Sequence, residues 1–476
     1  MQTQLVVIGA GPGGYAAAFM ASDLGMKVTL VDLERSLGGV CLLRGCIPSK
    51  ALLHVARVMA EAQHLADWGV SFAAPQIDLA AVRARKEKVI ATLTGGLKQI
   101  AKKRNVEVIQ AWARFEDSQT LRLDSVGGQP VADPRLQFEH CIVATGSSPT
   151  RLPAFNLPTS RIMDSTGALE LADVPKSLLI VGGGYIGLEM GSVYAALGSR
   201  VSVVELTDGL LPGADRDLVK PLHARLEKTF AGIWLNTKVV SLADKKDAIE
   251  VTFDGAAPEK TQRFDRVLLS IGRRPNSADL GLEKTKVQVD KRGFITVGDR
   301  ARTADPKILA IGDVAGEPML AHKAAHQAKA AVEALAGHPV AFHPRAIPAV
   351  VFTDPEVAWA GLTQTEAARQ NRPVEVAQFP WAACGRAQAV GRTEGLTKWL
   401  IDPATQRVVG CGIVGPGAGD LISEAVLAIE MGAHVRDLTE AVHPHPTLSE
   451  TLGAAAEVHL GLATDLYRPR RDRSKA

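Results

Sequence analysis

Two stretches of the chain repeat one pattern: an apolar run, a glycine-rich turn, a helical segment, a second apolar run and a final acidic residue. The copies span residues 5–32 and 178–205, and in both the first glycine precedes the acid by 23 positions. Their turns have the form GxGxxG, with the glycines at Gly9, Gly11, Gly14, Gly182, Gly184 and Gly187. One such turn is weak evidence, but two in the same strand–helix–strand context predict an α/β chain with two Rossmann-like dinucleotide-binding units.

The acid that ends each copy indicates which dinucleotide is bound. The glycines let the backbone approach a pyrophosphate at a helix N-terminus, while the acid accepts a hydrogen bond from a ribose 2′-hydroxyl. Glu205 ends the second copy and predicts NAD rather than NADP. A 2′-phosphate about 4 Å from this carboxylate would be repelled by roughly 4 kcal/mol at an effective dielectric of about 20. The alternative is two glycine-rich turns in unrelated strand–helix units.

The motif GGVCLLRGCIPSK, shortly after the first copy, contains a closely spaced cysteine pair, Cys41 and Cys46. A regular helix would separate the two by about 7.5 Å along its axis, whereas a disulfide requires Cα atoms about 4.4–6.8 Å apart. Gly45 and Pro48 predict a local irregularity that closes this gap. Cys46 is expected to start the following helix with Lys50 one turn later on the same face, and both features favour a thiolate. The alternative is two buried structural cysteines.

A second motif, HPHPTLSE, lies near the C-terminus. Thr447 and Glu450 have the spacing of a helix capping box, so residue types alone predict that Glu450 caps a helix. They also predict that His445 is an exposed turn residue, with catalysis as the alternative. His443 is interpreted as a second turn residue or as a support for the site.

Composition excludes several classes of protein. Of 476 residues, 46% are hydrophobic and 22% are charged, which is typical of a folded chain of about three domains. The net charge of +3 argues against nucleic-acid binding, because residues 468–476 contribute +4 and the rest of the chain −1. No positive leader and no uncharged run of about 20 apolar residues is present, so we expect no membrane span and a cytoplasmic location. We expect no metal site, and buried thiols at Cys141, Cys384 and Cys411.

The rest of the sequence predicts both helices and strands. They are a long helical stretch at 49–104, a strand-rich piece at 106–147, strands at 264–272 and 307–313, and helices near 420–431 and 449–462. From about residue 346 short alternating strands begin, and together with these helices they indicate an α+β unit.

The motifs together resemble those of the pyridine nucleotide–disulfide oxidoreductases, most closely the members that oxidise dihydrolipoamide. The resemblance covers almost the entire chain except the basic tail. It rests on residues 9–14, 41–50, 144–147 (ATGS), 182–189, 311–313 (IGD), 319–322 (MLAH) and 445–450. This combination is specific, and it favours a catalytic role for His445.

The resemblance implies an order of domains along the chain. Residues 1–147 would bind FAD, and residues 148–271 would bind NAD. Residues 272–345 would complete the FAD-binding domain, and residues 346–476 would form a dimerisation domain that ends in the basic tail.

The resemblance also implies which residues contact each cofactor. Those that would bind FAD are Gly9, Gly11, Gly14, Asp32, Gly39, Cys41, Lys50, Ala113, Thr145, Gly146, Ser147, Asp313 and Ala321. Those that would bind NAD are Gly182, Gly183, Gly184, Tyr185, Ile186, Gly187, Glu205, Val239, Ser270, Ile271, Gly272 and Arg273. Asp313 would hold the ribityl chain, and Lys50 would lie beside the flavin and pair with Glu189. Tyr185 is interpreted as a gate that covers the flavin until nicotinamide displaces it, with ordinary core packing as the alternative.

The implied reaction begins when dihydrolipoamide attacks a Cys41–Cys46 disulfide at Cys41, while His445, oriented by Glu450, takes its proton. Cys46 then passes the electrons to the flavin, which reduces NAD. The resemblance further implies a homodimer in which His445 of the partner subunit reaches the disulfide. The implied partners are lipoyl domains of 2-oxo acid dehydrogenase complexes or the carrier protein of glycine cleavage.

Residue differences separate this reading from its alternatives. Leu43 stands where the family usually has Asn, which predicts that a hydrogen bond beside Cys41 is missing and that redox tuning differs. Members that reduce glutathione would carry basic residues in place of Glu205, and members that reduce mercuric ion would carry a C-terminal cysteine pair, but no cysteine follows Cys411. A flavoprotein retained mainly for the assembly of a larger complex is the remaining alternative.

Overall fold

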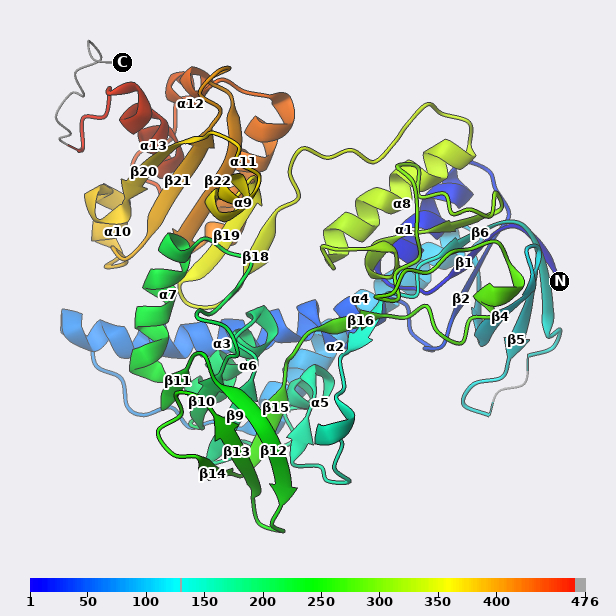
Figure 1. Ribbon diagram of the computed structural model, residues 1–476, viewed down its shortest axis with the longest axis horizontal. Coiled ribbons are helices and arrows are strands. Elements are labelled where there is room, and N and C mark those ends of the chain that lie inside the picture. Colours follow the sequence, from blue (N-terminus) through cyan, green and yellow to red (C-terminus); the bar gives the residue numbers. More distant parts are fainter. Residues whose placement is uncertain (129–130, 467–476) are drawn as a thin grey trace.

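The first apolar run of the chain forms the central strand of a mixed sheet in the computed structural model, which describes residues 1–128 and 131–466 (Figure 1). Strand β1 (Gln2–Ile8) pairs in parallel with β2 (Val28–Asp32) and β6 (Arg135–Val143). The order is β3-β2-β1-β6-β5-β4, and β17 also pairs with β6. The other elements of this unit are α1 (Pro12–Asp23), β3 (Glu107–Gln110), β4 (Trp112–Asp117), β5 (Thr120–Asp124), η3 (Leu282–Lys284), β17 (Ile308–Ala310), η4 (Gly312–Ala315) and α8 (Ala321–Leu335).

The second glycine-rich copy forms a separate parallel sheet, drawn in green below the first unit (Figure 1). Strand β9 (Ser177–Val181) lies between β10 (Arg200–Val204) and β15 (Arg266–Leu269) in the order β11-β10-β9-β15-β8. A short ribbon, β7 (Ser147–Pro149) with β16 (Arg273–Pro275), connects the two units. The other elements are η2 (Pro153–Phe155), β8 (Ile162–Met163), α5 (Ser165–Glu170), α6 (Tyr185–Ala196), α7 (Arg216–Thr229), β11 (Gly232–Trp234), β12 (Lys238–Asp244), β13 (Ile249–Asp254) and β14 (Thr261–Phe264).

The C-terminal unit is a five-stranded antiparallel sheet in the order β18-β19-β22-β21-β20. Its core includes Trp381 and Trp399, whose indole N–H groups are satisfied by the Thr397 hydroxyl and the Leu452 carbonyl, both at 2.9 Å. Buried Trp requires such partners. The elements are β18 (Ala349–Val351), β19 (Glu356–Gly361), α9 (Gln364–Arg369), β20 (Glu375–Pro380), η5 (Trp381–Ala383), α10 (Gly385–Ala389), β21 (Leu396–Ile401), β22 (Val408–Gly415), α11 (Ala418–Met431), α12 (Val435–Glu440) and α13 (Glu450–Leu460).

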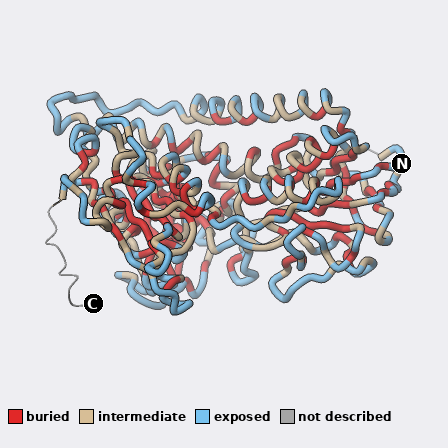
Figure 2. The backbone as a smooth tube through the Cα atoms, turned by 90° about the horizontal axis from the view of Figure 1, so that it is seen from above, coloured by how far each residue is buried: buried red, intermediate tan, exposed pale blue. Residues whose placement is uncertain are grey.

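The predicted fold class, two Rossmann-like units followed by an α+β unit, is confirmed. Buried residues follow the strands of each sheet, and exposed residues lie along the outer loops and outer helix faces (Figure 2). The strand expected over 264–272 is split in two: β14 ends at Phe264 and β15 begins at Arg266. The split arises because the chain leaves the antiparallel sheet β12-β13-β14 and enters the parallel sheet at this point.

The long helical stretch predicted over 49–104 is two helices. Helix α3 (Cys46–His64) continues into η1 (Leu65–Trp68) and stops at Gly69, which adopts φ +86. Helix α4 (Leu79–Lys103) begins where the Asp78 carboxylate accepts hydrogen bonds from two backbone N–H groups of the first turn, at 2.9 and 3.0 Å. The helical periodicity on both sides of this loop hides the break, since the only local signals are a glycine and a cap.

One stretch of the described residues, Gly39–Trp68, is long and apolar enough to cross a membrane by length and composition alone. It is not one helix, because α2 (Gly39–Arg44) ends before Gly45 and α3 begins after it. Within the protein, α3 packs against α4 and α6 and runs between the second and third units (Figure 1). These contacts bury Leu52, Leu53 and Ala56 on α3, and 33% of the apolar window is buried.

A buried cluster of charges joins the second and third units. The ammonium of Lys398 on β21 is 2.8 Å from Asp215 and 2.7 Å from Asp217, and it also donates to Gln364. Asp215 accepts further hydrogen bonds from the backbone N–H of Gln364 and Thr365. Burial alone would raise the pKa of Asp215, but these donors outweigh it and lower the pKa, so the carboxylate stays charged.

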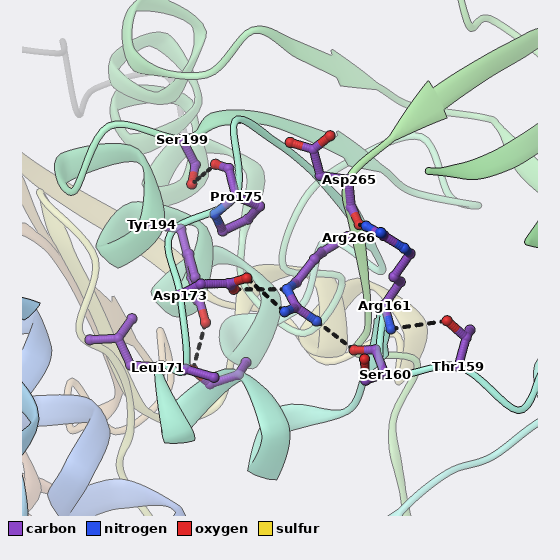
Figure 3. Close-up of polar contacts among 12 residues, drawn as sticks. Thr159, Ser160, Arg161, Leu171, Asp173, Pro175, Tyr194, Ser199, Asp265 and Arg266 are labelled. Carbon is purple, nitrogen blue, oxygen red and sulfur yellow. Dashed lines mark hydrogen bonds and ion pairs between the residues drawn. The ribbon is translucent and has the colours of Figure 1, made fainter. Parts of the chain in front are cut away.

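A second polar network fixes α5 within the second unit (Figure 3). The Tyr194 hydroxyl donates to the Ala168 carbonyl at 2.9 Å, and the Arg266 guanidinium contacts both oxygens of Asp173 at 2.7 and 2.8 Å. Arg266 also donates to the Ser160 carbonyl at 2.5 Å. The network holds α5 against α6 and β15, and residues of α5 line the cavity described next.

Candidate active site

A cavity of about 890 Å³ lies where the first unit meets α3 and α6. It is lined by backbone and side chains that the sequence assigns to FAD binding: Gly9, Gly11, Asp32, Gly39, Cys41, Lys50, Ala113, Thr145, Gly146, Ser147, Asp313 and Ala321. Three residues assigned to NAD binding, Tyr185, Ile186 and Arg273, also line it. These residues come from segments far apart in the chain, so the fold gathers one extended site from them.

The wall formed by α1 fits the pyrophosphate of a dinucleotide. The helix has no side-chain cap and no acidic residue in its first turn, so its N-terminal N–H groups are free to bind an anion. A Cβ on Gly14 would stand 1.7 Å from the Gly9 carbonyl oxygen. Only glycine at position 14 therefore allows the helix to approach the turn this closely.

The acid that ends each copy binds its own glycine-rich turn. Asp32 accepts a hydrogen bond from the Ala10 N–H, and burial raises the pKa of its carboxyl although this bond opposes the shift. Glu205 is buried, accepts from the Gly183 N–H at 2.7 Å and accepts from the Thr207 N–H and hydroxyl at 2.8 Å. Both acids therefore brace a turn as well as ending a strand.

The second glycine-rich turn lies apart from the cavity. Of the residues expected to bind NAD, nine do not line this cavity: Gly182, Gly183, Gly184, Gly187, Glu205, Val239, Ser270, Ile271 and Gly272. Ser270 supports this turn, because its hydroxyl donates to the carbonyls of Val181 and Gly182 at 3.0 and 3.1 Å. The Val239 side chain is buried in the core of the second unit.

The cysteine pair lies at the junction of α2 and α3. Both sulfurs are thiols here, and Cys46 begins α3, as the sequence predicts. A Cβ on Gly45 would stand 2.8 Å from the Val40 carbonyl oxygen, so glycine is required for the sharp break that brings the cysteines together.

The two thiols differ in acidity. The hydrogen bond from Cys41, helped by the Lys50 ammonium, outweighs burial and the Glu189 carboxylate and lowers the pKa of Cys46 to about 7. The same hydrogen bond, together with burial, raises the pKa of Cys41. Cys46 is therefore the sulfur that carries the negative charge near neutral pH.

An ion pair stands beside Cys46. The Lys50 ammonium is 2.8 Å from the Glu189 carboxylate, whose side chain is only 4% exposed. Tyr185, at the start of the same helix as Glu189, faces the cavity, and desolvation by its surroundings raises the pKa of its hydroxyl to about 12. Its phenol is therefore neutral at physiological pH.

Sequence reasoning missed a chain of hydrogen bonds along one wall. Arg273 donates to the hydroxyl and carbonyl of Ser147 at 2.8 and 2.6 Å, and the Ser147 hydroxyl donates to Asp313 at 2.5 Å. Arg273 is thereby tied to the first unit rather than directed at the second turn. Other lining residues without a sequence signal are Trp112, Ser165, Thr166, Asn276, Lys291 and Arg292.

His445 is placed away from the cavity within one chain. Its ring is 78% exposed, and its Nδ1 lies 2.9 Å from Glu450. Half of the capping box expected at Thr447 is present, because Glu450 accepts from the Thr447 backbone N–H at 2.7 Å. The other half is absent: the Thr447 hydroxyl donates to the Pro444 carbonyl, and the helix starts at Glu450 with Ser449 as its N-cap. Burial alone would raise the pKa of Glu450, but the Thr447 N–H and the His445 ring outweigh it and lower the pKa. Glu450 therefore stays charged and orients His445.

Comparison with known proteins agrees with the arrangement of two dinucleotide-binding units and a third unit. Residues 3–328 match the family model described as pyridine nucleotide-disulphide oxidoreductase, and residues 347–456 match the dimerisation domain of that family. The chain belongs to the pyridine nucleotide-disulphide oxidoreductase family. Membership explains why two dinucleotide folds and a cysteine pair occur in one chain.

Relatives and solved structures of the family match over nearly the full length. The chain is 49% identical to the dihydrolipoyl dehydrogenase of Haemophilus influenzae, over 98% of this chain and 97% of that protein. It is 47% identical to the dihydrolipoyl dehydrogenase of Vibrio cholerae, over 100% of this chain and 99% of that protein. The crystal structure of LpdA from Mycobacterium tuberculosis is similar at a TM-score of 0.88 and 27% identity, covering 96% of this chain and 99% of that one. The flavoprotein disulfide reductase RclA from Escherichia coli, as a Cu(II) complex, is similar at a TM-score of 0.85 and 26% identity, with the same coverage.

The unequal acidity of the two thiols makes a spectroscopic prediction. After two-electron reduction of the FAD-loaded protein, a long-wavelength absorbance from the Cys46 thiolate beside the flavin should develop as the pH rises through about 7. Cys41→Ser should show this band without reductant, since Cys46 is then unable to form the disulfide. Cys46→Ser should lack the band at every pH, and a normal band in that variant would contradict the assignment.

Proposed function

We propose that this chain is a dihydrolipoyl dehydrogenase, an enzyme that oxidises dihydrolipoyl groups to lipoyl groups and reduces NAD+ to NADH. The observation that carries the proposal is the cysteine pair at the wall of a dinucleotide-sized cavity, with Cys46 beside Lys50 and Glu189. The names of the relatives, at up to 49% identity over nearly the full length, support the same activity.

In the proposed reaction a thiol of the substrate attacks the Cys41 sulfur of the oxidised pair. The S–S bond between Cys41 and Cys46 breaks, and a mixed disulfide forms with Cys41. The second substrate thiol then displaces Cys41, so the substrate leaves as a cyclic disulfide and both cysteines are reduced. FAD, when bound in the cavity, supplies the transfer of two electrons between the dithiol and NAD+.

Side chains of the protein carry the negative charge and accept the proton in this reaction. The low pKa of Cys46 lets it leave as a thiolate when the disulfide opens. His445, held by Glu450, acts as the base that removes the substrate thiol proton. Because His445 is exposed and far from the cavity of its own chain, we propose that it serves the cysteine pair of the partner subunit in a homodimer. The match to a dimerisation domain supports this arrangement.

The second unit is proposed to bind NAD at its own glycine-rich turn. The open N-terminus of α6 lacks a side-chain cap, which suits a pyrophosphate. The buried Glu205 carboxylate would repel the 2′-phosphate of NADP. Tyr185 stands in the cavity wall at the start of α6, where it is placed to gate the approach of nicotinamide to the flavin.

We propose a cytoplasmic location and lipoyl domains as partners, either of 2-oxo acid dehydrogenase complexes or of the glycine-cleavage carrier protein. Leu43 places an apolar side chain between the cysteines where the family usually has Asn, and a shifted redox potential is the expected consequence. The basic tail from Arg468 lies outside the described residues.

The proposed function predicts turnover of lipoamide with NADH. The FAD-loaded protein should reduce lipoamide with NADH at a kcat/KM at least 100-fold above that with NADPH. The reason is that about 4 kcal/mol of repulsion at Glu205 corresponds to more than about 100-fold in affinity. Glu205→Arg and Glu205→Gln should both narrow the preference for NADH over NADPH, because each removes the negative charge, and Glu205→Gln should also loosen the turn and raise the KM for NADH. Equal use of both nucleotides by the wild type would contradict the NAD assignment, and turnover of other disulfides but not lipoamide would contradict the substrate.

A mixed dimer tests whether the site is shared. The Cys46→Ser protein should be inactive, because it lacks one sulfur of the redox pair. The His445→Gln protein should be nearly inactive, since loss of a general base costs about 100- to 10,000-fold in rate. After dissociation and reassociation, the mixture should regain activity, because one of the two sites in each heterodimer then holds both residues. Inactive mixtures in which mass spectrometry shows heterodimers would mean that His445 serves its own chain.

A further inference from the structure

Two contacts join Phe352, the residue that follows β18 in the third unit, to the ion pair of Lys50 and Glu189. Its ring centroid lies 4.5 Å from the Lys50 ammonium. Its backbone N–H donates to one carboxylate oxygen of Glu189 at 3.0 Å, while Lys50 binds the other oxygen at 2.8 Å. One residue of the third unit therefore holds both members of the ion pair beside Cys46.

Phe352 acts on this pair from outside the cavity. Lys50, Glu189 and Cys46 line the cavity, whereas Phe352 does not. The Lys50 side chain is 33% exposed and has a long flexible stem, so the position of its ammonium depends on its contacts. These are the Glu189 carboxylate at 2.8 Å, the Ser49 hydroxyl at 3.2 Å and the Phe352 ring. At a partly exposed site, an aromatic face at this distance favours the bound position of a cation over its displaced position by about two- to fivefold in the equilibrium constant.

The position of the Lys50 charge matters because of what else faces Cys46. The titratable groups around its sulfur are the Cys41 thiol on α2, the Tyr15 phenol on α1, and Glu189 and Tyr185 on α6. The Glu189 carboxylate raises the pKa of Cys46, whereas the Cys41 thiol and the two phenols have raised pKa values and stay neutral near pH 7. Lys50 is the one cation among the named groups, so a small displacement of its ammonium changes the stability of the thiolate.

We propose that Phe352 is a positioning residue for the redox pair: its ring and its N–H fix Lys50 and Glu189 so that the third unit controls the ionisation of Cys46. The inference rests on the proposed redox role of Cys46. It adds a function for the third unit that is separate from subunit association, namely the tuning of a thiol within its own chain.

The test compares Phe352→Leu with Phe352→Tyr in the FAD-loaded protein after two-electron reduction with dithiothreitol. The long-wavelength thiolate absorbance is recorded against pH. Phe352→Leu keeps an apolar side chain and loses the aromatic face, so the midpoint should rise and the thiolate-to-thiol ratio at pH 7 should fall about two- to fivefold. Phe352→Tyr keeps the face and should titrate like the wild type.

Two results would overturn the proposal: an unchanged midpoint in Phe352→Leu, or equal shifts in the leucine and tyrosine variants. The latter would show that packing matters rather than the ring. FAD content and circular dichroism check folding, and Phe352→Met serves in place of Phe352→Leu if that protein loses FAD, with the same expected shift. The absorbance needs only FAD and the reduced cysteines, so a failure of lipoamide turnover leaves this test intact.

Discussion

The ion pair between Lys50 and Glu189 is the contact through which the three units of the chain define one site. Lys50 projects from α3 one turn after Cys46, Glu189 projects from α6 of the second unit, and the third unit holds both through Phe352. Glu189 is almost fully buried, and a buried carboxylate without a partner is strongly destabilising. The units are therefore constrained to the arrangement in which the cysteine pair faces the cavity.

The two glycine-rich copies show how one motif serves two purposes. Each copy closes its turn with an acid that accepts a hydrogen bond from the turn itself. In the first copy the turn forms the cavity wall beside the cysteine pair. In the second copy the turn lies apart, and the helix that follows it supplies Tyr185 and Glu189 to the first cavity. The second unit thus contributes both a separate nucleotide site and part of the redox site.

The local motifs were predictable from the sequence because each is written in a few consecutive residues. Two glycine-rich turns predicted two Rossmann-like units, and Gly45 between the cysteines predicted the break before Cys46. What the sequence did not predict depends on partners far apart in the chain. Arg273 bonds to Ser147 across 126 positions, and Phe352 reaches Glu189 across 163. No periodicity records such pairs, and the loop between α3 and α4 was hidden for the opposite reason, since regular helical spacing flanks it.

The same distinction explains the C-terminal motif. Residue types predicted a capping box, but Thr447 uses its hydroxyl within the turn. Glu450 accepts from the Thr447 N–H with one oxygen and binds His445 with the other. The exposed ring lies outside the cavity that holds the cysteine pair of its own chain, which makes subunit association part of the proposed chemistry. A third unit that carries the base and also holds Lys50 would link the two cysteine-containing sites of a dimer.

The most direct test of this account is the ionisation of Cys46 when Glu189 loses its charge. In Glu189→Gln the amide keeps the shape of the side chain, and its one oxygen still accepts from the Phe352 N–H. Lys50 loses its carboxylate partner but keeps the Phe352 ring and the Ser49 hydroxyl, and the negative charge near Cys46 disappears. Titration of the thiolate absorbance in the reduced, FAD-loaded protein should give a midpoint below that of the wild type, because the Glu189 carboxylate raises the pKa of Cys46. A midpoint that is unchanged or higher would contradict the claim that this ion pair sets the charge of the redox centre.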